Sequence, residues 1–128
     1  MEKLIIEADT STPMINFDPV NHKFIIIGES YPENTASFYE PVFNWLKLYF
    51  GQSNNQKIEL NIELLYFNSS SSKVLSDIFD LFLSHKDKHQ SITINWRYHE
   101  ENDMSLEYGE EFQEEFEDLD INLIEFSD

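Results

Sequence analysis

Four consecutive serines, Ser69–Ser72, are the residues of this chain best placed to do chemistry. They follow an apolar run typical of a strand and open an amphipathic run typical of a helix. Free backbone N–H groups and the helix dipole favour negative charge at such a helix start, so a hydroxyl there can carry a phosphate. Asn68 is a preferred capping residue, and Lys73, one turn in, can balance a phosphate. The alternative is that the serines only cap the helix.

Other side chains with possible chemistry form weaker patterns. His85 and His89 are spaced to share a metal ion at a helix end, but no third ligand is evident near them. The acids from Glu107 to Glu117 are typical of a solvated helix face. The chain has no Gly-rich phosphate loop and no nucleophile elbow, which disfavours a hydrolase on this acidic helix. We therefore expect no catalytic group, no metal and no cofactor.

The charge balance is strongly acidic. Lys and Arg total 8 against 25 Asp and Glu, a formal net charge of −17. Phosphate backbones and anionic lipids repel such a chain, so we expect no nucleic-acid partner and no membrane insertion. Cysteine is absent, which excludes disulfides, and no apolar run approaches the ~20 residues that span a bilayer. These observations predict a cytoplasmic protein.

Hydrophobic periodicity predicts one α/β domain over residues 1–128, with a mixed sheet, an N-terminal hairpin and helices packed on the sheet. Strands that alternate with helices predict parallel pairing with right-handed crossovers. The helices are expected from Asn34 or Thr35 to about Phe50, from the serines to beyond Leu83, and from Met104 to Phe116. The strands are expected at 3–7, 14–18, 23–28, 57–67, 91–98 and 119–126.

Local signals refine these elements. Pro41 predicts either a kink in the first helix or a later start, and Gly51 predicts its end. Residues 28–34 are expected to form a loop. The unbroken apolar runs 25–27 and 65–67 predict strand segments covered on both faces of the sheet.

Five blocks of this sequence occur in the order found in a known family: Ser11–Pro13, Gly28–Asn34, Tyr66–Lys73, Trp96–Tyr98 and Gly109–Phe112. By these blocks the chain resembles the SiaC family of bacterial regulatory phosphoproteins. The family is STAS-like, similar to anti-sigma factor antagonists in its arrangement of strand, phosphosite and helix. Those antagonists carry Asp where this chain has Asn68, so a different kinase surface is expected.

The resemblance implies a switch protein that is not an enzyme. Ser69 is the implied phosphoacceptor and Ser70 the second choice, with Asn68, Ser71 and Lys73 around them. A Ser/Thr protein kinase would add the phosphate and a PP2C-like phosphatase would remove it. The unmodified form would bind and activate an effector, a diguanylate cyclase in cyclic-di-GMP and biofilm signalling.

A second segment is a candidate part of the partner surface. It consists of Tyr31, Pro32, Glu33 and Asn34, which by composition are equally typical of a turn and a helix cap. Two other functions stay open at this point. One is a constitutive protein-interaction module without phosphorylation, and the other is a partner switch of the anti-sigma-antagonist type.

Overall fold

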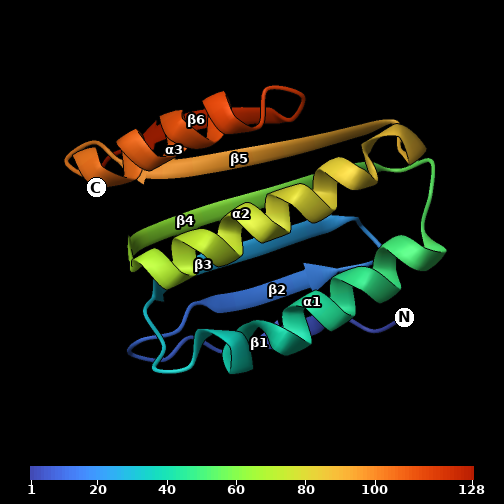
Figure 1. The fold of residues 1–128 in the computed structure, drawn as a ribbon, viewed down its shortest axis with the longest axis horizontal. Helices are drawn as coiled ribbons and strands as arrows, with labels where there is room; N and C mark the ends of the chain where they lie inside the picture. Colours follow the sequence, from blue (N-terminus) through green and yellow to red (C-terminus); the bar gives the residue numbers. More distant parts are fainter.

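A computed structural model describes residues 1–128, and it contains one six-stranded sheet whose strands lie in chain order (Figure 1). The pairs β1–β2 and β2–β3 are antiparallel, and the pairs β3–β4, β4–β5 and β5–β6 are parallel. The predicted mixed α/β fold with its N-terminal hairpin is therefore confirmed. The strands are β1 (Leu4–Ile6), β2 (Met14–Asp18), β3 (Lys23–Ser30), β4 (Lys57–Phe67), β5 (Ser91–His99) and β6 (Asp120–Phe126). The helices are α1 (Thr35–Gln52), α2 (Ser69–Ser84), α3 (Asp103–Glu115) and the short 3-10 helix η1 (Lys86–Lys88).

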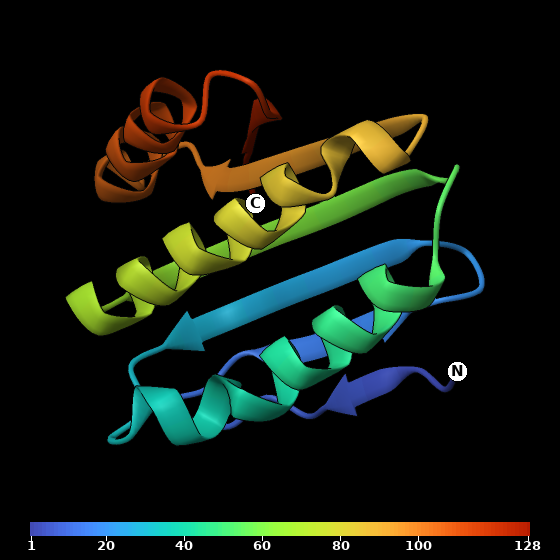
Figure 2. The same cartoon turned by 45° about the vertical axis from the view of Figure 1, so that its right-hand side comes forward.

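The three α-helices all lie on one face of the sheet (Figures 1 and 2). Strand β4 shows that only the helical face of the sheet is fully buried, because its side chains alternate between the two faces. Ile58, Leu60 and Ile62 are buried beneath the helices, whereas Glu59 and Asn61 on the other face are only partly buried. The protein therefore has two layers, and the second face of its sheet carries no helix.

This open face corrects one expectation from the sequence. The runs 25–27 and 65–67 were expected to be covered on both faces, and that prediction is wrong. Ile27 is 36% exposed, Leu65 is 65% exposed and Tyr66 is 43% exposed. Since every crossover helix packs on the same side of the sheet, alternate side chains of these apolar runs meet solvent.

Helix α1 differs from prediction at Pro41 and Gly51, the two residues expected to interrupt it and to end it. It begins at Thr35, where Asn34 Oδ1 accepts a hydrogen bond from the Ser37 N–H at 3.0 Å. It then continues through Pro41, so the predicted later start is wrong. Pro41 is exposed, and water can satisfy the carbonyl that loses its N–H partner there. Gly51 lies inside the helix rather than ending it.

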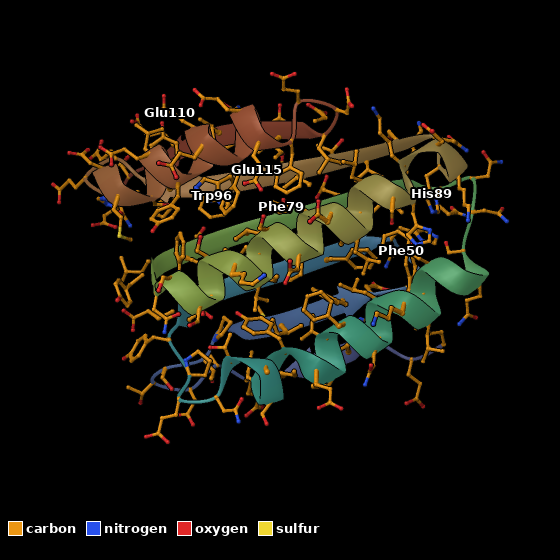
Figure 3. All side chains as sticks on the ribbon, viewed as in Figure 1. Phe50, Phe79, His89, Trp96, Glu110 and Glu115 are labelled. Atoms are coloured by element: carbon orange, nitrogen blue, oxygen red, sulfur yellow. The ribbon has the colours of Figure 1, made fainter.

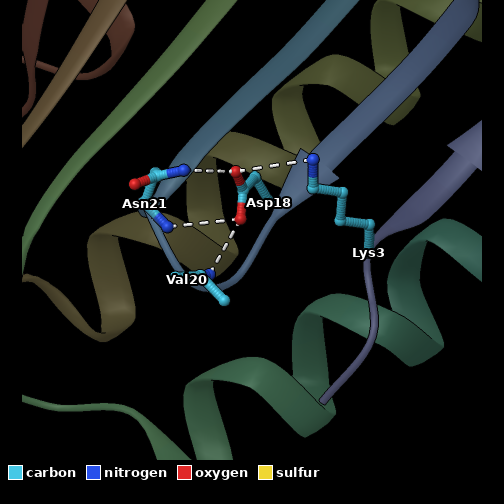
Figure 4. Close-up of polar contacts among 4 residues, drawn as sticks. All are labelled: Lys3, Asp18, Val20 and Asn21. Atoms are coloured by element: carbon cyan, nitrogen blue, oxygen red, sulfur yellow. Dashed lines mark hydrogen bonds and ion pairs between the residues drawn. The ribbon is translucent and has the colours of Figure 1, made fainter.

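The turn between β2 and β3 is organised by Asp18 (Figure 4). Its carboxylate accepts hydrogen bonds from the Val20 N–H at 2.9 Å and from the Asn21 side chain at 2.8 Å. These bonds, that from the Asn21 side chain most strongly, lower the pKa of the Asp18 carboxyl. Lys3 Nζ lies 3.9 Å from the same group, and His22 completes the turn in the left-handed region with φ 58°.

Aromatic side chains fill the space between the helices and the sheet. Figure 3 labels Phe79 on α2 and Trp96 on β5, and both are buried. The Trp96 indole N–H donates to the Ser105 carbonyl at 2.9 Å, which ties the start of α3 to β5. Between α2 and α3, Glu115 accepts a hydrogen bond from the Ser76 hydroxyl at 3.0 Å. None of the helices combines the length and apolar character needed to cross a membrane.

We expect Gly109→Ala to destabilise the protein. A Cβ on Gly109 would lie 2.7 Å from Trp96 Cδ1 and 2.7 Å from Leu123 Cδ2, so α3 could no longer approach the sheet. Overpacking of this kind costs about 1–3 kcal/mol, and the better helix propensity of Ala returns about 1 kcal/mol. Urea unfolding should therefore show a net loss of up to about 2 kcal/mol.

Gly51→Ala is the matched control, because Gly51 is also helical but a Cβ added there would meet no atom within 4 Å. This variant should be as stable as the unmodified chain or more stable by up to about 1 kcal/mol. Equal losses in both variants would contradict the packing assigned to Gly109.

Candidate functional site

The serine run begins helix α2 at the carboxyl end of β4. Asn68 is the N-cap residue, with extended backbone angles (φ −87°, ψ 175°). Its side-chain Oδ1 accepts from the Ser71 N–H at 2.9 Å, and its carbonyl accepts from the Ser72 N–H at 2.9 Å. Ser69 is therefore the first helical residue. Ser69, Ser70 and Ser71 occupy positions whose backbone N–H groups have no intrahelical partner, and the Asn68 side chain satisfies that of Ser71.

The four serines differ in accessibility. Ser69 and Ser70 are exposed, Ser72 is partly buried, and Ser71 has no exposed surface. A kinase needs access to the hydroxyl that it modifies. In the folded chain this requirement disfavours Ser71, and the most accessible of the four are Ser69 and Ser70, the two residues that the sequence ranked first and second.

Ser71 belongs instead to a buried chain of three hydroxyls. Its Oγ lies 2.7 Å from Ser30 Oγ at the end of β3, and Ser30 Oγ lies 2.6 Å from the Tyr39 hydroxyl on α1. All three residues are buried, and burial raises the pKa of Tyr39. The Ser30 hydroxyl has one hydrogen and two lone pairs, so it can bond both partners at once, and either oxygen of each pair can be the donor. These bonds join the phosphosite turn to β3 and to α1.

The sequence did not reveal the roles of Ser30 and Tyr39. Ser30 lies in a stretch expected to be a loop, and Tyr39 is one of many aromatic residues in the chain. The expected loop is wrong at its start, because β3 continues to Ser30. No local sequence signal could have found them, because Ser30 comes to stand opposite Phe67, the last residue of β4, only through the pairing of the two strands.

Lys73 lies one turn after Ser69 on the same side of α2, since residues four apart are neighbours on a helix. Its Nζ is 3.9 Å from the Asp77 carboxylate, one further turn along. Both side chains are well exposed, and such pairs contribute little to stability. Lys73 can therefore exchange Asp77 for a stronger anion at position 69.

The segment Tyr31–Asn34 lies beside the serines, because the Asn68 N–H donates to the Ser30 carbonyl at 3.1 Å. The Tyr31 ring meets Tyr66 edge-on, with centroids 5.6 Å apart. Pro32 is buried and Asn34 caps α1, whereas Glu33 is exposed. The side chains of Glu33 and Asn34 are exposed and that of Tyr31 is partly exposed, so they are accessible in this segment, whereas Pro32 is not.

Three of the five blocks noted in the sequence, Ser11–Pro13, Gly28–Asn34 and Tyr66–Lys73, meet at the carboxyl ends of β3 and β4. The Tyr31 N–H donates to the Ser11 carbonyl at 2.8 Å, which brings the segment 11–13 against 31–34. The segment 31–34 in turn borders the serine run. Residues far apart in the chain therefore form one continuous surface around Ser69.

His85 and His89 follow the C-terminal end of α2, opposite the serines, and Figure 3 labels His89 there. The ring of His85 stacks on Phe50 with centroids 4.6 Å apart, and His89 meets the same ring edge-on. Burial lowers the pKa of both histidines, so their neutral forms are favoured as packing partners. No group of three or more His, Asp or Glu side chains is arranged to hold a metal ion.

Comparison with known proteins gives one consistent result. Residues 6–126 match the family model described as SiaC family regulatory phosphoprotein. An uncharacterized protein of Pseudomonas aeruginosa strain UCBPP-PA14 is 32% identical over 115 residues, which cover 90% of each chain.

Solved structures agree with this match. Apo-SiaC from Pseudomonas aeruginosa is 30% identical, with a TM-score of 0.80 and 98% of each chain covered. A crystal structure of the diguanylate cyclase SiaD in complex with its activator SiaC, from the same species, contains a similar chain. That chain is 30% identical, with a TM-score of 0.83, and the match covers 98% of this chain and 99% of that one.

The buried hydroxyls predict a specific order of stabilities. Ser30→Ala removes the central hydroxyl and leaves both Ser71 and Tyr39 without their shared partner, which should cost about 2–3 kcal/mol. Ser71→Ala and Tyr39→Phe each leave Ser30 with one partner and should cost about 1 kcal/mol. Urea unfolding of the three variants measures this order.

Ser70→Ala is the control, because Ser70 is an exposed serine of the same helical turn and should change stability by less than about 0.5 kcal/mol. A Ser30→Ala variant no less stable than Ser71→Ala would show that Ser30 is not the centre of the hydroxyl chain.

Proposed function

The chain belongs to the SiaC family of regulatory phosphoproteins, and from this premise we propose that it is a phosphorylation-controlled activator of a diguanylate cyclase. The unmodified form binds the cyclase, and a phosphate on Ser69 ends that binding. A Ser/Thr protein kinase adds the phosphate and a PP2C-like phosphatase removes it, in the cytoplasm. The protein acts by binding and not as an enzyme, in line with a relative described as the activator of SiaD.

The observation that carries this proposal is the exposed hydroxyl of Ser69 at the first position of a helix. The dipole of a helix start stabilises an anion by about 0.3–1 kcal/mol. A phosphate carries about −1.5 to −2 charges near neutral pH, so the site tolerates the modification that the family name implies. The fold therefore remains intact while its surface charge changes.

Lys73 can support a phosphate on either exposed serine. It follows Ser69 by four residues and Ser70 by three, and residues at both spacings are neighbours on a helix. A phosphate on either serine can draw Lys73 away from Asp77. The choice of Ser69 over Ser70 therefore rests on the resemblance to the family.

Loss of binding follows from the cost of burying charge. A partner that covers Ser69 must remove water from the phosphate, and an unpaired buried dianion costs several kcal/mol. Each ~1.4 kcal/mol corresponds to a tenfold change in affinity. A single phosphate is therefore sufficient to separate the complex without unfolding either protein.

Phosphorylation assays on single serine variants test the proposed site. We expect a Ser/Thr kinase of the same organism to add one phosphate to the unmodified chain and to Ser70→Ala, but none to Ser69→Ala, because position 69 then has no hydroxyl. Intact-mass measurement with peptide mapping gives the stoichiometry and the site.

Ser71→Ala serves as a second control, since the Ser71 hydroxyl is buried in the folded chain and its removal should leave the phosphate stoichiometry unchanged. Full labelling of Ser69→Ala, with the phosphate mapped to Ser70, would reject Ser69 as the acceptor. A chain never modified in its native cells would favour a constitutive interaction module instead.

A further inference from the structure

Three of the four histidines of the chain lie at one corner of the molecule, at the end of α2 far from the serines. His85 follows α2, His89 follows η1, and His22 lies in the turn between β2 and β3. The rings of His85 and His89 cover the buried ring of Phe50 near the end of α1, and Figure 3 labels Phe50 and His89 there. The phosphorylation switch does not use this corner.

The loop between α1 and β4 is tied to η1 and the residues after it by hydrogen bonds. The Asn55 N–H donates to the Lys88 carbonyl at 2.7 Å, and the Gln90 N–H donates to the Gln56 carbonyl at 2.9 Å. A third bond involves a side chain that can change its charge, because the Gln56 N–H donates to His89 Nδ1 at 3.3 Å. We call these three bonds the latch.

The latch requires a neutral His89. Nδ1 can accept a hydrogen bond only while it carries no proton, so the single ring proton lies on Nε2. Nε2 is buried and has no hydrogen-bond partner. A second proton would have to go on Nδ1, where it would face the Gln56 N–H. Protonation therefore breaks the bond to Gln56 and leaves both ring N–H groups of a cation without acceptors inside the protein.

The groups around His89 add to the cost of a charge on its ring. Burial, followed by the positive fields of His85, His22 and Lys88, lowers the pKa of His89. Asp87 is the one carboxylate among residues 81–99, and it is exposed on η1. The titratable and charged groups of the segments that meet here are His85 after α2, His22 with its hydrogen-bond partner Tyr49, Lys57 at the start of β4, and Lys86, Asp87 and Lys88 of η1.

His85 is subject to opposing effects and is the less sensitive of the two rings. Burial, followed by the field of Lys88, lowers its pKa as well. However, its ring lies flat on Phe50 at the C-terminal end of α2, and an aromatic face and a helix C-terminus both favour a cation. At His89, by contrast, the bond from Gln56 itself requires the neutral form.

We propose that the latch is a pH-sensitive device, in which protonation of His89 releases the loop 53–56 from η1. A proton that only the open state binds readily shifts the equilibrium toward that state as the pH falls. The stabilisation by the latch is complete above about pH 6.5, the ordinary pKa of histidine, and is lost as the pH falls below it. Opening moves the His89 ring away from Phe50 and uncovers an apolar side chain. The serines at the other end of α2 keep their cap, because the Asn68 side chain does not titrate.

Two amide groups with similar partners provide a matched test. The Gln56 N–H bonds to the His89 side chain near one end of α2, and the Ser71 N–H bonds to the Asn68 side chain at the other. Hydrogen exchange followed by NMR gives a protection factor for each amide. Between about pH 7.5 and about pH 5.5, protection of Gln56 should fall about three- to tenfold, because a single proton is bound in the open state. Protection of Ser71 should change less than about twofold, since no titrating group holds it.

Two variants separate His89 from the other histidines. His89→Asn keeps an acceptor close to the position of Nδ1 but cannot be protonated, so the protection of Gln56 should become independent of pH. His99→Asn is the control, because His99 Nδ1 also accepts from a backbone N–H, that of Glu101 at 3.1 Å, but lies at the far end of β5. In this variant the fall in protection at Gln56 should be unchanged.

Equal protection of Gln56 at the two pH values in the unmodified chain would overturn the inference, and this measurement does not depend on the folding of any variant. An equal fall at Ser71 would also overturn it, because acid would then loosen the whole molecule. A fall at Gln56 that persists in His89→Asn would assign the pH dependence to another group and reject the latch.

Discussion

The parallel pairing of β3 with β4 is the constraint on which the rest of the site depends. It brings the carboxyl ends of two strands together, so that Ser30 stands opposite Phe67 and bonds to the backbone of Asn68. From that junction one strand leads into the segment 31–34 and the other into α2. The hydroxyl chain depends on this pairing, because it places Ser30 beside the start of α2, where the Ser30 and Ser71 hydroxyls meet.

The same pairing explains how a modification can act without disturbing the fold. The inner side of the first turn of α2 is bound through Ser71 to Ser30 and Tyr39, whereas its outer side presents Ser69 to solvent. Charge added outside does not enter the core. The proposed phosphate would instead change what can approach the surface formed by the exposed serines and the segment 31–34.

Much of this arrangement could be predicted from the sequence. The order of strands and helices follows from periodicity, and a strand that leads into Asn68 and a serine run indicates a capped helix start. The apolar run 65–67 was misjudged, because periodicity reports that a residue is apolar and not whether a layer covers it. Likewise, nothing local distinguishes Ser71 from Ser69. Their different burial depends on β3 and α1, which lie far away in the sequence.

The affinity of homogeneously phosphorylated protein for the cyclase tests the central claim most directly. Protein with phosphoserine encoded at position 69 should bind at least about a hundredfold more weakly than unmodified protein, because the dianion must be desolvated in the complex. Its free energy of unfolding should lie within about 1 kcal/mol of the unmodified value, since the helix start tolerates the charge. Equal affinity of the two forms for the cyclase would contradict the account.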